Sequence, residues 1–170
     1  MKSTRKLIFL ILILFLPVLI FLFLKGLGTN KFEIPIYYTD GVPSQQRFDC
    51  VYPEGEYRIN WPADFNLQTP AALFVGADTF DRNMLRRIGR NHETGVQVYL
   101  LDTVETRVEG ITMEQRSKDQ IIKLLHCTFA SDTTGQWILI DDEQRIRGYY
   151  NTSLEEQDRL LNEISILMSN

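Results

Sequence analysis

The chain contains few of the side chains that carry nucleophilic, redox or metal chemistry. Its 170 residues include two cysteines and two histidines. Cys50 and Cys127 are too far apart to form a C-x-x-C or C-x-x-x-C motif, which excludes the usual dithiol redox site. The sequence has no G-x-S-x-G motif and no glycine-rich phosphate loop, so hydrolase and nucleotide chemistry have no support. We therefore expect a protein that is not an enzyme.

One long hydrophobic run occupies the amino-terminal end. Residues 7–24 are eighteen consecutive residues without a polar side chain. As a helix the run is about 27 Å long, close to the ~30 Å hydrocarbon core of a bilayer. Lys2, Arg5 and Lys6 precede it, which predicts a cytoplasmic amino terminus. The run exceeds a signal-peptide core and no A-x-A-like site follows it, so we predict that residues 1–25 are a single-pass anchor in the inner membrane. A signal peptide cleaved near the small residues Gly26 and Gly28 is the alternative.

The part of the chain after the anchor is acidic. It holds all 22 acidic residues and 14 of the 18 basic residues, a net charge of −8. A nucleic-acid partner would require a basic face, so this class of partner is excluded. The orientation predicts that this part faces the periplasm or the outside, where Cys50 and Cys127 could form a disulfide. Two separate buried thiols are the alternative.

Strands and helices alternate regularly from residue 71 onward. The expected strands are residues 71–75, 96–101, 136–140 and 145–149. Helices are expected over 80–90, after a Ser117–Gln120 capping box, and after a Ser153–Glu156 capping box. The order β-α-β-α-β-β-α predicts a parallel sheet with an antiparallel hairpin at one edge. We therefore predict an α/β, thioredoxin-like domain over residues 71–170.

The expected helices bury one face each, and an extension precedes the domain. The predicted helical core residues are Phe80, Met84, Leu85, Ile88, Ile121, Ile122, Leu124, Leu125, Leu160, Leu161, Ile164, Leu167 and Met168. Residues 26–70 are expected to be a linker and an extension with short strands. That extension includes an edge segment at 32–38 and a hairpin of 47–52 with 56–61.

Two segments resemble a known family. They read GTNKFEIPIYYTDG after the anchor and TTGQWILIDDEQRIRGYYNTSLEEQDRLLNEISIL at the end of the chain. Together they resemble the SCO/SenC proteins, membrane-anchored thioredoxin-like copper chaperones of cytochrome oxidase assembly. The resemblance covers residues 26–167 and is strongest in the hairpin ILIDDEQRIRGYY. It implies a thioredoxin-like fold and a role in respiratory-complex or copper-protein biogenesis.

The chain departs from this family at the copper ligands. Family members bind copper through a C-x-x-x-C motif after the first core strand and a His before the hairpin. The corresponding segments here read GADTFDRN and SDTTG, with no Cys and no His. The resemblance therefore implies a divergent, non-catalytic binding or assembly factor without a cofactor. The alternatives are a copper chaperone using Cys50, Cys127 and a His, or a thiol oxidoreductase using Cys127.

Two groups of residues are candidates for metal or acid–base chemistry. His126 and Cys127 are adjacent soft ligands that Cys50 and His92 could complete into a metal site. Alternatively, His126 favours the carboxyl end of a helix and Cys127 is a buried or disulfide-bonded residue. Asp78 and Asp81 could bind a cation, or they could cap the helix that follows them.

The remaining candidates are surface and aromatic residues. A basic stripe that could bind an acidic protein partner, or be a solvated helix face, consists of Arg82, Arg86, Arg87 and Arg90. The residues that could line a cleft or belong to the core are Trp61, Trp137, Tyr149 and Tyr150. Asn151-Thr152-Ser153 matches a glycosylation sequon, although Ser153 is also the expected helix cap.

Overall fold

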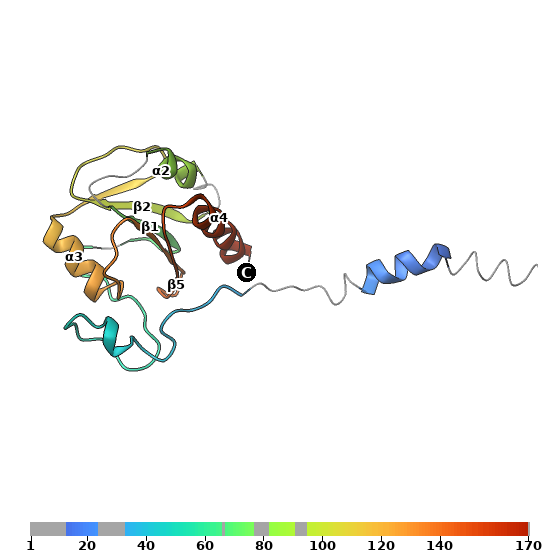
Figure 1. The fold of residues 1–170 in the computed structure, drawn as a ribbon, viewed down its shortest axis with the longest axis horizontal. Helices are drawn as coiled ribbons and strands as arrows, with labels where there is room; N and C mark the ends of the chain where they lie inside the picture. The colour runs from blue at the N-terminus through green and yellow to red at the C-terminus, as the bar shows by residue number, and fades with distance from the viewer. Residues whose placement is uncertain (1–12, 24–32, 66, 77–81, 91–94, 170) are drawn as a thin grey trace, which may run out of the picture. The chain divides into compact units, whose positions relative to one another are not determined.

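A mixed five-stranded sheet is the centre of the folded part of the chain. The computed structural model describes residues 13–23, 33–65, 67–76, 82–90 and 95–169. The strands are β1 (Ala71–Val75), β2 (Gln97–Asp102), β3 (Thr112–Gln115), β4 (Gln136–Ile140) and β5 (Ile146–Tyr150). Their order in the sheet is β3-β2-β1-β4-β5 (Figure 1). β1, β2 and β3 are parallel, and β4 is antiparallel to both β1 and β5.

Three helices pack on this sheet, and they cover different faces. They are α2 (Arg82–Gly89), α3 (Lys118–Cys127) and α4 (Leu154–Ser169). One face carries side chains such as Leu73 and Leu101, which pack with α3 and with residues 42–67. The opposite face carries Phe74 and Leu100, which pack with α2 and α4. Figure 1 shows α2 and α4 on one side of the sheet and α3 on the other. This alternation follows from the two-residue period of a strand.

The chain divides into two compact units, Met1–Glu33 and Ile34–Asn170. In the first unit, residues 13–23 are helical, and all their large hydrophobic side chains are exposed. Within the described residues no helix has the length and hydrophobicity to cross a membrane. Residues 1–12, 24 and 25 of the predicted anchor lie outside the described part of the chain.

The predicted order of elements from residue 71 onward is present, with one additional strand. β3 was not predicted because its sequence, TMEQ, has no apolar residue beyond Met113 and no alternation of hydrophobicity. It nevertheless pairs with β2 at the edge of the sheet, with Tyr99 opposite Thr112. The predicted helix over 80–90 corresponds to α2, and its first two residues lie outside the described part.

The capping boxes differ in how completely they form. At α3, Ser117 Oγ accepts a hydrogen bond from Gln120 N at 3.3 Å, and Gln120 Oε1 accepts one from Ser117 N at 3.0 Å. At α4, Ser153 Oγ accepts from Glu156 N at 3.3 Å, but Ser153 N donates to Asn151 Oδ1 at 2.8 Å. The first box is therefore reciprocal as predicted, whereas the second is only half formed.

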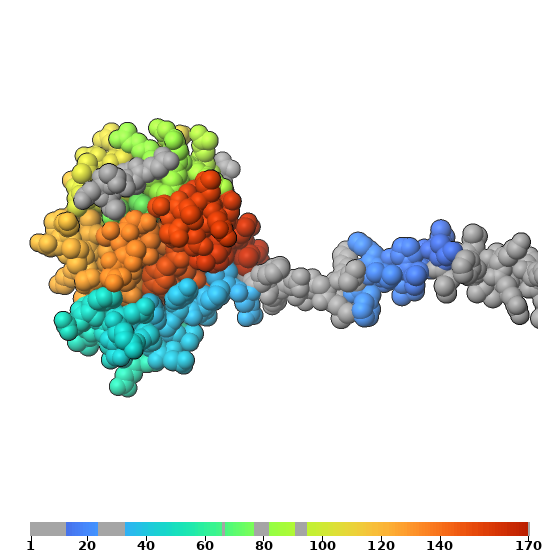
Figure 2. All heavy atoms as spheres, in the orientation of Figure 1, coloured from blue at the N-terminus to red at the C-terminus, as the bar shows by residue number. Residues whose placement is uncertain are grey.

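The segment before the sheet, residues 33–65 and 67–70, is the part that the sequence predicted least well, and we call it the irregular segment. The strands expected at 32–38, 47–52 and 56–61 are absent among the described residues. The backbone N–H groups of Tyr57 and Ile59 donate instead to Tyr38 O and Gln144 O, at 3.0 and 2.8 Å. This irregular segment contains one short 3₁₀ helix, η1 (Ser44–Gln46), and it lies against the carboxyl-terminal half of the domain (Figure 2).

Most of the predicted helical core residues are buried, but two are exposed. Ile122 is 38% exposed and Met168 is 41% exposed. Ile122 is adjacent to the buried Ile121, and the helical period turns it away from the sheet. Met168 lies in the last turn of α4, beyond the buried Ile164.

Candidate functional site

The carboxyl ends of β1 and β2 border a pocket with both polar and apolar lining residues. In open α/β sheets ligands bind in the crevice outside the carboxyl ends of the strands. Here a pocket of about 380 Å³ is lined by Gly76, Asp102, Thr103, Lys118, Ile121, Ile122, His126, Asp132 and Thr134. Asp102 is 4% exposed, and its Oδ1 accepts a hydrogen bond from Thr103 N at 2.5 Å. The Asp102 side chain lies against the backbone of residue 76, where a Cβ atom would be 2.5 Å from Oδ2. Glycine at residue 76 allows the two to lie this close.

The pocket includes one of the site residues that the sequence suggested, His126. Asp78 and Asp81 lie outside the described residues, as does His92. Among the residues that the structure describes, no three His, Cys, Asp or Glu side chains are grouped as a metal site requires. The polar part of the lining consists of the buried Asp102 carboxylate, the threonine hydroxyls and groups such as Lys118, which can hold polar ligands.

Cys50 and Cys127 form a disulfide, one of the two alternatives that the sequence left open. Their Cα atoms are 5.4 Å apart, and 77 positions separate them in the sequence. The bond joins the irregular segment to the carboxyl end of α3. Neither sulfur is a thiolate in this state, so neither is a copper ligand or a nucleophile.

His126, the other member of the predicted soft-ligand pair, is held by an aromatic contact. Its ring stacks on Phe48, with centroids 4.3 Å apart and an interplanar angle of 14°. Phe48 and Asp49 both have a positive φ, which places the turn before Cys50 in a conformation that brings this ring to α3. The structure thus brings Cys50, His126 and Cys127 together as a junction between two segments.

Four tyrosine hydroxyls bind the carbonyl groups at the carboxyl end of α3. Tyr57 donates to Thr128 O at 2.8 Å, Tyr149 to Phe129 O at 2.5 Å and Tyr38 to Ala130 O at 3.2 Å. Tyr52 donates to His126 O. The His126 carbonyl belongs to the last turn of α3, where carbonyls have no partner within the helix. The other three carbonyls belong to residues 128–130, directly after the helix.

Burial raises the pKa of each of these tyrosines above its ordinary value. Burial raises the pKa of Tyr52 to about 12, and the neighbouring Tyr38 adds a smaller increase. Burial also raises the pKa values of Tyr38, Tyr57 and Tyr149. The hydroxyls therefore remain protonated donors at neutral pH, and the cluster is structural.

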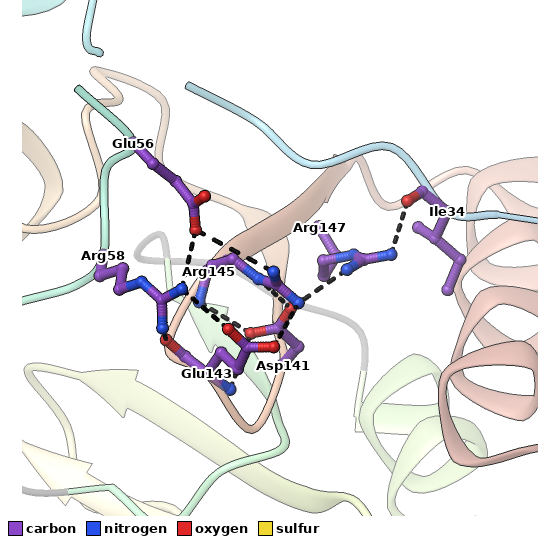
Figure 3. Close-up of polar contacts among 7 residues, drawn as sticks. All are labelled: Ile34, Glu56, Arg58, Asp141, Glu143, Arg145 and Arg147. Carbon is purple, nitrogen blue, oxygen red and sulfur yellow. Dashed lines mark hydrogen bonds and ion pairs between the residues drawn. The ribbon is translucent and has the colours of Figure 1, made fainter. Parts of the chain in front are cut away.

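A buried ion-pair network connects the same irregular segment to the β4–β5 hairpin (Figure 3). Asp141, which is 1% exposed, accepts from Arg145 Nε at 2.8 Å and from Arg147 Nη1 at 3.1 Å. Arg147 Nη2 also donates to Ile34 O at 2.6 Å. Arg58 reaches the turn from the irregular segment, with its Nη2 2.8 Å from Glu143 Oε2. The sequence indicated an acidic turn here but not the arginines that bind it.

The predicted arginine stripe lies on α2 and the residue after it. Arg82, Arg86 and Arg90 are exposed, and their four-residue spacing places them along one face. Arg87 differs, because it forms an ion pair with Asp158 and donates to Gln157 Oε1 at 3.3 Å. The opposite side of α2 buries Met84, Leu85 and Ile88. We call Arg82, Arg86 and Arg90 the arginine stripe.

The aromatic candidates do not form one cleft, because they lie on opposite faces of the sheet. Trp61 and Tyr149 pack on the α3 face, whereas Trp137 and Tyr150 belong to the core beneath α2 and α4. Trp137 is fully buried, and the Tyr150 hydroxyl donates to Glu163 Oε2 at 2.5 Å. The residues of the sequon, Asn151-Thr152-Ser153, are exposed, and Asn151 and Ser153 take part in the cap of α4.

Comparison of this chain with protein-family models, curated proteins and solved structures finds no match.

Proposed function

We propose that this protein is a membrane-tethered, extracytoplasmic binding or assembly factor with a thioredoxin-like domain of SCO/SenC type. The observation that carries the binding role is the arginine stripe, three exposed cations in a part of the chain that has a net charge of −8. A cationic face of this kind favours and orients an acidic protein partner. Residues 1–25 would hold the domain at the outer face of the inner membrane.

The strand order supports the thioredoxin-like assignment. Without β3, the chain runs β1-α2-β2-α3-β4-β5-α4, with two parallel strands followed by an antiparallel hairpin. Helices α2 and α4 pack on one face of the sheet and α3 on the other. These are the connections and layers expected for that fold. β3, which pairs parallel to β2 at the edge, is an addition to it.

The disulfide supports the extracytoplasmic location and the absence of redox chemistry in this state. Disulfides persist in oxidising compartments and are rare in the cytosol. Because Cys50 and Cys127 bind each other, a copper site or a reactive thiol would require their reduction. The copper-chaperone alternative therefore predicts stoichiometric Cu(I) binding by the reduced full chain that is lost on Cys127→Ala.

The test is the assembly of the copper-containing oxidase in cells that lack this protein. We expect less assembled oxidase in a deletion strain, and recovery with the full chain but not with a chain lacking residues 1–25. The variant Arg82→Glu/Arg86→Glu/Arg90→Glu should fail to restore assembly, because an acidic partner is then repelled. Absorbance of the oxidase haems in isolated membranes measures the outcome.

Two controls separate the stripe from charge in general. Replacing the same three arginines by lysine keeps the cationic face and should restore assembly. The variant Arg107→Glu adds acidic charge at an exposed residue away from the stripe and should also restore assembly. An unchanged amount of assembled oxidase in the deletion strain would contradict the assembly role. Full restoration of assembly by the triple glutamate variant would contradict binding at the arginine stripe.

A further inference from the structure

A second cleft lies on the face of the sheet opposite the arginine stripe. It has a volume of about 410 Å³, within the ~300–1,000 Å³ typical of ligand sites. Residues 60–65 form one wall and α3 forms the other. This cleft and the pocket at the ends of β1 and β2 have no lining residue in common. No part of the proposed function uses this cleft.

The apolar part of the cleft is rigid because its aromatic rings pack on one another. The Trp61 ring lies 5.5 Å from Phe65 and 6.0 Å from Phe129, measured between centroids. Phe65 is 2% exposed, and Leu124 of α3 is 6% exposed. Trp61 is half-buried, so part of its surface remains available. A preformed apolar wall of this kind binds without a large ordering cost.

The polar rim of the cleft has one cation that is not paired with a carboxylate of the described residues. Its charged residues are Arg116, Lys123 and Asp64. Arg116 is held in place, since its Nη2 donates to Asp64 O at 2.6 Å and lies 3.6 Å from Glu114 Oε2. Lys123 is exposed and forms no ion pair within the described part of the chain.

Hydrogen-bond donors also predominate at this rim. Gln120 Oε1 is already occupied, because it accepts from Ser117 N at 3.0 Å, which leaves its amide N–H groups as donors. The ammonium of Lys123 is likewise a donor only. A carboxylate is the group that satisfies donors and positive charge together.

We propose that this cleft binds a peptide segment of a partner protein in which an acidic side chain lies beside an apolar one. The carboxylate would bind at Lys123 and Gln120, and the apolar side chain would pack on Trp61 and Leu124. This inference is separate from docking at the arginine stripe, because the two surfaces cover opposite faces of the sheet.

The test uses the full chain in detergent micelles and two peptide probes. These are acetyl-leucyl-aspartyl-leucinamide and its asparaginyl analogue, which differ only in the carboxylate. Trp61 and Trp137 are the two tryptophans, so ¹H–¹⁵N spectra contain two indole N–H signals. We expect the aspartyl peptide to shift the Trp61 signal and leave that of the fully buried Trp137 in place.

Matched charge variants identify the binding group. Lys123→Gln should weaken binding of the aspartyl peptide roughly threefold, the effect expected for an exposed ion pair. Arg107→Gln removes one positive charge from an exposed residue outside the cleft, and binding should not change. The proposal is overturned if both peptides bind equally, if neither shifts the Trp61 signal, or if the two variants weaken binding alike.

Discussion

Asp141 is the single residue on which the contact between the hairpin and the preceding segment most directly depends. Its two oxygens accept four hydrogen bonds, from Glu143 N, Arg145 N, Arg145 Nε and Arg147 Nη1. A carboxylate buried to this degree is stable only when cations and donors surround it. The two arginines are in turn mostly buried, with side chains 17% and 12% exposed.

Asp141→Asn should lower the free energy of unfolding by about 3 kcal/mol. The amide removes the carboxylate that pairs with the mostly buried Arg147, whereas Arg145 keeps Glu143, whose Oε1 lies 3.2 Å from its Nη2. Chemical denaturation of the full chain measures the change. Asp142→Asn is the matched control, because Asp142 is exposed, and its effect should stay within about 0.5 kcal/mol. Similar losses in both variants would show that the buried network is not what stabilises the hairpin.

At the scale of elements, the end of α3 is where segments far apart in the sequence meet. Hydroxyls from the irregular segment and from β5 bind the carbonyl groups of residues 126–130. Each such hydrogen bond contributes about 1 kcal/mol, and a buried carbonyl left without its donor costs more. The tyrosines therefore hold α3 against both segments.

The tyrosine cluster predicts a loss of stability at alkaline pH. The tyrosine pKa values are raised on folding, so the stabilisation is complete below about pH 10, the pKa of an unfolded tyrosine. As the pH rises further, the unfolded chain releases protons that the folded chain keeps. The free energy of unfolding should then fall by up to about 1.4 kcal/mol per pH unit for each such tyrosine.

A tyrosine variant assigns this pH dependence. Denaturation between pH 9 and pH 11 should show a shallower decline for Tyr149→Phe, which removes a buried hydroxyl. An unchanged slope in Tyr149→Phe would mean that this hydroxyl is not the group that keeps its proton.

At the scale of the whole molecule, residues 34–67 belong to the same core as the sheet. Val42, Tyr57, Ile59 and Phe65 are each at most 3% exposed and pack on the α3 face. The disulfide, the tyrosine cluster and the Asp141 network all attach this segment to the rest of the unit. We conclude that it is a part of the folded domain and not a linker before it.

Removing the disulfide should lower stability without changing the fold. Closing a loop across 77 positions contributes roughly 4 kcal/mol on chain-entropy grounds. Cys50→Ala/Cys127→Ala, or reduction with dithiothreitol, should therefore lower the melting temperature of the domain. Circular dichroism below the transition should be unchanged. Equal melting temperatures for the oxidised and reduced chains would contradict this role.

The elements from residue 71 onward, apart from β3, could be predicted from sequence because each carries a local signal. Buried strands such as Ala71–Val75 are apolar runs, and the Ser117–Gln120 box sets the start of α3. The arginine stripe could also be predicted, since its four-residue spacing is a property of the helix alone. β3 and the irregular segment have no such period, so their conformations depend on the partners that they pair or pack with.

The sequence by itself determines the hydrophobic run, the acid excess and the alternation of strands and helices, because each of these depends on neighbouring residues. Only the tertiary structure decides that Cys50 meets Cys127, that Asp141 binds Arg145 and Arg147, and that residues 60–65 form a cleft with α3. These features join segments tens of residues apart, and no local preference encodes which distant partner a side chain will contact.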